Sequence, residues 1–121
     1  MEDQVERAVA YAAKQLLHHS EAVFHAGILI ELQGRGFIVE REVPVPVPFV
    51  PSWSSEILTA GSVRFDCVVR FKNQVVVIEV KRNPSSTYKS QLLKYKELLT
   101  DGWGLALATY DNVQWIKRPS K

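Results

Sequence analysis

Residues 61–82 have the sequence GSVRFDCVVRFKNQVVVIEVKR, two strand-like apolar segments separated by a short polar turn. The second segment carries Glu79 and Lys81 two positions apart, and side chains at this spacing share one face of a strand. If the two segments pair as a hairpin, Asp66 on the first segment reaches the same face. Two carboxylates and one ammonium group that converge on a sheet predict a divalent-metal site with a cation beside it.

These three charged residues also have a simpler interpretation, in which they keep an exposed sheet face soluble. Glu79 argues against it, because this residue lies inside V-V-V-I-E-V, an apolar run typical of a strand buried on both faces. A lone carboxylate in such a place is costly unless it binds a metal or a cation. We therefore favour a functional site.

The composition predicts one domain over residues 1–121, because 46% of the 121 residues are hydrophobic and 10% are aromatic. No apolar run is long enough to span a bilayer, and the acidic start MEDQVERAV lacks a signal-peptide pattern. The single cysteine, Cys67, cannot form an intrachain disulfide, and we expect it to pack in the core. A cytoplasmic protein without a membrane segment is expected.

The net charge of +2 is distributed unevenly along the chain. Residues 1–61 hold four Lys and Arg against eight Asp and Glu, whereas residues 62–121 hold eleven against five. A basic surface around an acidic metal site suits a phosphodiester substrate, although solvated helix faces also carry lysines. The cations expected to contact nucleic acid are Arg64, Arg82, Lys89, Lys94 and Lys96.

Hydrophobic periodicity predicts the element order α, α, β, β, β, α, β, β. Helices are expected over residues 3–18, 21–34 and 86–100, and strands over residues 37–45, 63–71, 75–81, 103–110 and 113–117. The last helix has an apolar stripe that includes Tyr88 and Leu92. Four prolines from Pro44 to Pro51 remove backbone donors, so this segment should form an edge or a loop with Trp53 exposed.

Two motifs in this order of elements resemble the PD-(D/E)XK nuclease superfamily. Its first motif places an Asp at the second core strand, and Asp66 matches it, with Phe65 in place of the frequent leading Pro. Its second motif, (D/E)-x-K, is matched by Glu79, Val80 and Lys81. The resemblance implies an α/β fold with a restriction-endonuclease-like core, α-β-β-β-α-β, in which helices flank a central mixed sheet.

Two further patterns narrow the resemblance. RecB-like members carry a Gln and a Tyr four positions apart on the following helix, matched by Gln91 and Tyr95. The small GxxExxY proteins of the same superfamily are similar over about residues 18–110. In that pattern Glu21 is kept, while the Gly is replaced by His18 and the Tyr by Phe24.

The resemblance implies a role for each matched residue. Asp66 and Glu79 would bind Mg²⁺ or Mn²⁺, and the backbone carbonyl of Val80 would be a third protein ligand. Lys81 would orient the attacking water or stabilise charge on the phosphate. The remaining catalytic candidates are Glu21, which would lie beside the metal, and Gln91 and Tyr95, which would line the site.

Several of these residues also have an ordinary structural interpretation. Glu21 directly after Ser20 is a first-turn acid of the kind that the helix dipole favours. Tyr95 fits the apolar stripe of its helix equally well. His25, one turn after Glu21, is interpreted as a histidine on the helix surface or at the edge of the core.

The function implied is hydrolysis of DNA by a metal-dependent nuclease, with an endonuclease on structured, branched or single-stranded DNA as the expected form. The motifs do not separate endonuclease from exonuclease. The expected partner is DNA, and a homodimer, as in the small Holliday-junction resolvases, or a larger nuclease complex is left open. The main alternative is a non-catalytic nucleic-acid-binding or assembly subunit on the same fold, which has no need of Asp66, Glu79 and Lys81 together. A toxin or defence effector is a third possibility.

Overall fold

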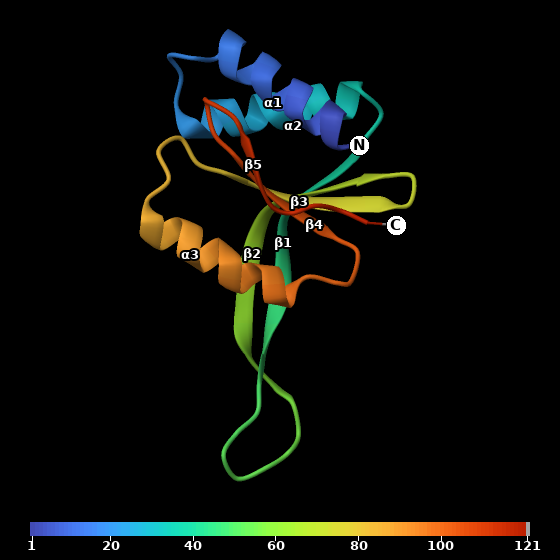
Figure 1. The fold of residues 1–121 in the computed structure, drawn as a ribbon, viewed down its shortest axis with the longest axis vertical. Helices are drawn as coiled ribbons and strands as arrows, with labels where there is room; N and C mark the ends of the chain where they lie inside the picture. The colour runs from blue at the N-terminus through green and yellow to red at the C-terminus, as the bar shows by residue number, and fades with distance from the viewer. Residues whose placement is uncertain (121) are drawn as a thin grey trace.

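The computed structural model describes residues 1–120 and shows a five-stranded mixed sheet between two layers of helices (Figure 1). The helices are α1 (Glu2–Gln15), α2 (Glu21–Gly34) and α3 (Ser86–Tyr95), the last followed by a 3₁₀ turn, η1 (Lys96–Leu98). The strands are β1 (Ile38–Phe49), β2 (Leu58–Phe71), β3 (Gln74–Val80), β4 (Gly104–Ala108) and β5 (Val113–Lys117). The expected α/β fold class and element order are confirmed.

The strand order of the sheet is β1-β2-β3-β4-β5, and β3 pairs in parallel with β4, whereas the other pairs are antiparallel. The parallel pair needs a crossover connection, which α3 supplies. Val76 and Ile78 pack in the core under α1 and α2, and Val77 packs in the core under α3. Because β3 is buried on both faces, its sequence is apolar at nearly every position.

Helix α2 covers one face of the sheet because its apolar residues recur at helical spacing. Phe24 and Ile28 lie four positions apart and are both fully buried. Burial of such a side chain stabilises the fold by about 1.5–3 kcal/mol. The helix begins at Ser20, whose Oγ accepts a hydrogen bond from the N–H of Val23 at 3.3 Å.

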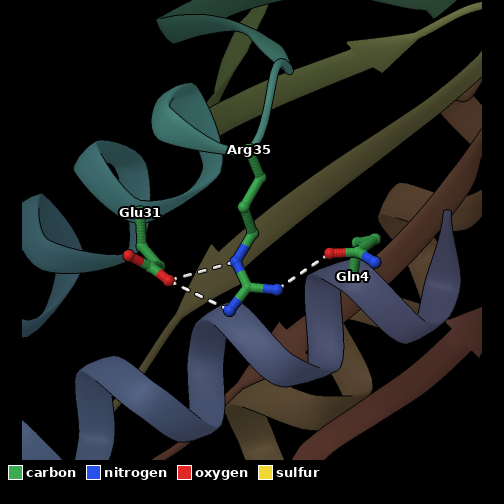
Figure 2. Close-up of polar contacts among 3 residues, drawn as sticks. All are labelled: Gln4, Glu31 and Arg35. Atoms are coloured by element: carbon green, nitrogen blue, oxygen red, sulfur yellow. Dashed lines mark hydrogen bonds and ion pairs between the residues drawn. The ribbon is translucent and has the colours of Figure 1, made fainter.

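Arg35, immediately after α2, connects α2 to α1, as Figure 2 shows. Its Nε and Nη2 each lie 3.0 Å from Oε2 of Glu31, and its Nη1 donates to Oε1 of Gln4 in α1 at 2.8 Å. A partly exposed ion pair contributes at most about 1 kcal/mol. The contact therefore mainly orients the two helices, while the apolar layer beneath them supplies the stability.

Strand β1 is longer than the sequence predicts, because it continues through Pro44, Pro46 and Pro48 to Phe49 while paired with β2. A proline in a ladder must turn its nitrogen away from the neighbouring strand, since it has no N–H to donate. The three prolines occupy alternate positions of an edge strand, so their nitrogens can all face the open edge. Trp53, in the loop that follows, is 79% exposed, as expected.

Two helices are shorter than predicted, and the predicted packing of the cysteine is correct. Helix α1 ends at Gln15 instead of residue 18, and α3 ends at Tyr95, where the tighter turn η1 replaces its last turn. Cys67 is fully buried, and its Sγ lies 3.5 Å from the carbonyl oxygen of Ile78. Within residues 1–120, no helix is both long and apolar enough to cross a membrane.

Candidate active site

Asp66 on β2 and Glu79 on β3 form the centre of the site. In the antiparallel pairing of these strands Cys67 lies opposite Ile78. The next residues along, Asp66 on β2 and Glu79 on β3, therefore also lie opposite each other. The N–H of Asp66 donates to Oε2 of Glu79 at 3.4 Å, and the N–H of Val80 donates to Oδ2 of Asp66 at 3.0 Å. Backbone donors thus hold the two carboxyl groups side by side.

Glu79 is the least satisfied acid of the site. The residue is 3% exposed, and its Oε1 is buried without a hydrogen-bond partner in the described part of the chain. Burial raises the pKa of Glu79 to about 9, helped by a hydrogen bond to the Asp66 side chain and by the charge of Asp66, while Lys81 acts in the opposite direction. A divalent cation would supply the missing partner and remove the repulsion between the two acids.

The donor set fits Mg²⁺ or Mn²⁺ with few protein ligands. Within the described part of the chain, no three His, Cys, Asp or Glu side chains gather into a metal-binding group. A metal at this point would rely on Asp66 and Glu79, with the Val80 carbonyl and water as the remaining ligands. Mg²⁺ tolerates this arrangement because it keeps several waters.

Lys81 follows β3 directly, and its ammonium group rests on an aromatic ring. Its Nζ lies 5.2 Å from the centroid of the Tyr88 ring, and its backbone N–H donates to the carbonyl of Ala108 at 3.1 Å. The ring face attracts a cation, so Tyr88 holds the ammonium group beside the cavity. The sequence places Tyr88 in the core stripe of its helix, and it contains no signal for this contact.

Glu21 reaches the site from the first turn of α2. Its Oε1 accepts a hydrogen bond from the backbone N–H of Arg82 at 2.8 Å. This bond joins residues 61 positions apart and ties the start of α2 to the chain just after β3. Glu21 therefore lies next to Lys81, although its sequence position is equally typical of an ordinary first-turn acid.

Tyr110, just after β4, fixes the start of α2 at this end of the sheet. Its ring stacks on Phe24 with 4.2 Å between the centroids, and its hydroxyl donates to the carbonyl of His19 at 2.8 Å. The guanidinium of Arg82 lies 5.1 Å from the centre of the same ring. An aromatic pair stabilises by about 0.5–1.5 kcal/mol beyond its area burial, so this cluster holds Glu21 in place.

The site residues line one cavity of about 200 Å³. Gln91 is the one predicted catalytic residue outside this lining, because it is exposed on α3. Tyr95 is half-buried and packs against Phe65 with 6.0 Å between the ring centroids, so it serves both the core and the cavity wall. The lining consists of Glu21, Arg64, Asp66, Glu79, Val80, Lys81, Tyr88 and Tyr95.

A larger cleft of about 540 Å³ lies between α1 and the β4–β5 turn. Its two acids, Glu6 and Asp111, come from separate elements, and Glu6 already accepts a hydrogen bond from Nε1 of Trp115 at 2.7 Å. This cleft has no counterpart to the paired carboxyl groups and buried unsatisfied oxygen of the smaller cavity. The chemistry therefore points to the smaller cavity.

Three of the five cations predicted to contact nucleic acid, Lys89, Lys94 and Lys96, lie on α3 and η1, whereas Arg64 is on β2 and Arg82 follows β3 near the start of α2. Arg64 lines the cavity, and its Nη1 lies 3.7 Å from Oε2 of Glu42. Both of these side chains are largely exposed. Arg82 and Lys89 line a neighbouring polar cavity of about 270 Å³. Lys94 on α3 and Lys96 in η1 are exposed.

His25 is half-buried on α2 and does not line the cavity. Burial is the main cause that lowers its pKa, and the negative charge of Asp66 acts in the opposite direction. Its Nε2 is buried and has no hydrogen-bond partner within residues 1–120. These properties agree with a histidine at the edge of the core.

Comparison with known proteins connects this geometry to a family. A sequence model of the PD-(D/E)XK nuclease superfamily matches residues 3–116, a range that contains every residue of the cavity lining. The fold is similar to the crystal structure of SSO0001, with a TM-score of 0.53 and 25% sequence identity over 99% of this chain and 67% of that chain. No curated protein gives a significant match.

Proposed function

The chain belongs to the PD-(D/E)XK nuclease superfamily, and on this premise we propose that it is a DNA nuclease that hydrolyses phosphodiester bonds with Mg²⁺ or Mn²⁺. The observation that carries the proposal is the pairing of half-buried Asp66 with buried Glu79, whose Oε1 has no hydrogen-bond partner among residues 1–120. A structural role gives no reason to place a second acid beside a buried one on the neighbouring strand, because each raises the energy of the other's charged form. A metal-binding role gives such a reason, because a bound cation offsets the repulsion between the two acids.

Six of the eight residues that line the cavity have a task in the proposed reaction. A metal held by Asp66 and Glu79, with the Val80 carbonyl, would polarise a phosphoryl oxygen and lower the pKa of water. Lys81, braced by Tyr88, would place its positive charge against the phosphate as negative charge accumulates there. Glu21, which lines the same cavity, would orient a water molecule beside the metal.

The lining of the cavity suits a phosphate group. Besides its acids it contains Arg64 and Lys81, whose positive charges attract the DNA backbone. Contacts to the DNA backbone fix position without reading sequence. We therefore propose an endonuclease on branched, structured or single-stranded DNA, with sequence recognition left to a partner.

A cleavage assay with Mg²⁺ or Mn²⁺ tests the proposed activity. The substrates would be linear duplex, single-stranded, flap and four-way-junction DNA, and Glu79→Ala would be the inactive control. We expect metal-dependent cutting by the wild type that disappears in the variant, with a preference for one of the non-duplex forms.

A negative assay would favour the alternative function. If the wild type cuts none of these substrates with either metal but still binds DNA, the chain is a binding or assembly subunit on the nuclease fold. Cutting that persists in Glu79→Ala would instead disprove the assignment of the site described above or reveal a contaminating nuclease.

The basic residues along α3 give a prediction about DNA binding. Lys89→Ala combined with Lys96→Ala should weaken DNA binding. The slope of the logarithm of the binding constant against the logarithm of the salt concentration should become shallower by about one to two, since each phosphate contact contributes about 0.9 to it. Fluorescence anisotropy at several salt concentrations measures this slope. A matched control is Lys14→Ala with Lys72→Ala, which removes the same charge from α1 and the β2–β3 turn. Equal slopes in both double variants would place the DNA elsewhere.

A further inference from the structure

The far ends of β1 and β2, with the loop between them, form an arm that projects from the domain beyond α3 (Figure 1). We define the arm as residues 44–62. Towards its tip, large apolar side chains are strongly exposed, and soluble monomers rarely display such a group unless it binds something. They are Phe49 (54% exposed), Val50 (54%), Trp53 (79%), Ile57 (72%) and Leu58 (41%).

The charge of the arm argues against DNA as its ligand. Residues 44–62 contain no Lys, Arg or His, and Glu56 is their only acid. Binding to the phosphate backbone depends on cations, which in this chain lie along α3 and around the cavity. The arm is therefore suited to an apolar protein surface.

The edge of the arm limits how a protein can bind to it. Pro44, Pro46 and Pro48 offer no N–H groups along the outer edge of β1, so another strand would find few donors there. A partner must therefore use side-chain contacts with the apolar tip rather than extend the sheet.

The chain itself carries an acceptor for such a tip. A cavity of about 470 Å³, which we call the base cavity because it reaches the segment that follows α3, lies along the arm beside β1 and β2. Ile57 and Leu58 belong both to its lining and to the exposed group, whereas Phe49, Val50 and Trp53 lie outside the lining. Glu97 is the only charged residue in its lining. The apolar part of the lining consists of Val45, Pro46, Pro48, Ile57, Leu58 and Leu98.

We propose that the arm tip of one chain docks into the base cavity of a second copy, and that two such contacts form a two-fold dimer. Each chain carries both the projecting tip and a cavity that can receive it. A two-fold rotation therefore repeats the contact, with the tip of each chain in the cavity of the other. Trp53 is the anchor of each contact, as tryptophan is enriched among residues that dominate interface energies. One aromatic side chain buries about 150–250 Å², so Phe49 and Trp53 would supply at most about half of the roughly 800 Å² per partner of a stable interface, and the other exposed side chains of the arm would add to it.

Sedimentation equilibrium over a range of concentrations tests this proposal without any reference to cleavage. The wild type should form a dimer of two 13.7 kDa chains. Trp53→Ser combined with Val50→Ser, which changes two exposed tip residues outside the cavity lining, should raise the dimer dissociation constant at least about tenfold. The control is Ile30→Ser, which removes an equally exposed side chain (69%) from α2, outside the arm, and should leave the dimer intact.

Disulfide cross-linking tests the geometry in chains that keep the apolar tip. Ser52→Cys in one chain and Thr100→Cys in another should form a mixed disulfide on oxidation, faster than either variant links to itself. Thr100 lines the base cavity and Ser52 is exposed beside Trp53, while the native Cys67 is buried and cannot compete.

Three outcomes would overturn the proposal. One is a wild type that remains monomeric at high micromolar concentration. Another is a dimer that survives the double tip variant or gives no mixed disulfide. The third is a monomer whose DNA affinity falls with Trp53→Ser, which would assign the arm to the substrate.

Discussion

Asp66→Asn should lower the rate of DNA cleavage by at least about a thousandfold and leave the fold unchanged. The amide has nearly the same size as the carboxylate, and its oxygen can still accept the hydrogen bond from the N–H of Val80. What disappears is the negative charge that would hold the metal beside Glu79. The rate is measured under single-turnover conditions on the preferred substrate, and circular dichroism checks the fold.

Two comparisons make this result specific to the site. Asp101→Asn, an exposed acid outside the cavity, should cleave at the wild-type rate. Lys81→Ala should also lose cleavage but still bind Mn²⁺ in calorimetry, because it removes charge stabilisation and leaves the carboxyl pair. Wild-type cleavage by Asp66→Asn or Lys81→Ala would disprove the assignment of the site.

Glu79→Gln should stabilise the metal-free protein at alkaline pH, by about 1–3 kcal/mol at pH 8. Folding raises the pKa of Glu79 from 4.5 to about 9, so between these values the folded protein keeps a proton that the unfolded chain releases. The free energy of unfolding of the wild type therefore falls as pH rises through this window. Gln cannot titrate, and its amide can donate to Asp66 as the protonated acid does.

Urea denaturation at pH 5, 7 and 8 in the presence of a chelator measures this difference. The two proteins should have similar stability near pH 5 and diverge as the pH rises. Glu56→Gln, an exposed acid of the arm, should follow the wild type. A wild type with constant stability over this range, or a Gln variant that is less stable at pH 8, would show that the carboxyl group is not held as described.

The change in the free energy of unfolding on adding metal is a second measurement on the wild type and Glu79→Gln. Mn²⁺ at a hundred times its dissociation constant should stabilise the wild type by about 2.7 kcal/mol. Glu79→Gln should respond weakly, since it has lost one ligand. An equal response in both proteins would place the metal elsewhere.

The sequence was sufficient to predict the sheet and the carboxyl pair, because both depend on local patterns. Alternation along residues 61–71 sets which side chains share a face, and the apolar run around Glu79 marks a strand buried on both sides. Once the two strands pair, the positions of Asp66 and Glu79 follow from the register. The parallel placement of β4 follows from the helix between β3 and β4.

The remaining parts of the site depend on contacts that no local pattern contains. The bond between Glu21 and Arg82 spans 61 positions and requires the packing of α2 on the sheet. Gln91 and Tyr95 share helical spacing, yet α3 is rotated so that fully buried Leu92 faces the core and Gln91 is exposed. Adjacent residues of a helix diverge by about 100°, so a small rotation decides which one reaches the cavity.

The proline segment shows a different limit of sequence interpretation. Prolines oppose strand formation on average. From Pro44 onward the sequence therefore predicts either a loop or an edge strand, without deciding between them. The structure forms a paired edge strand here, because prolines at every second position can all turn their nitrogens towards the open edge. Spacing, rather than proline content, decided between a loop and a strand.

Cys67 gives the protein an internal reporter of sheet opening. The thiol is fully buried next to Asp66, and burial raises its pKa far above the range in which a thiolate forms. A thiol reagent can therefore modify it only when β2 separates from its neighbours, and under suitable conditions the modification rate follows the population of that open form. Because the strand that carries the thiol also carries one of the two acids, labelling with and without Mn²⁺ would measure how far metal suppresses the opening of the site itself.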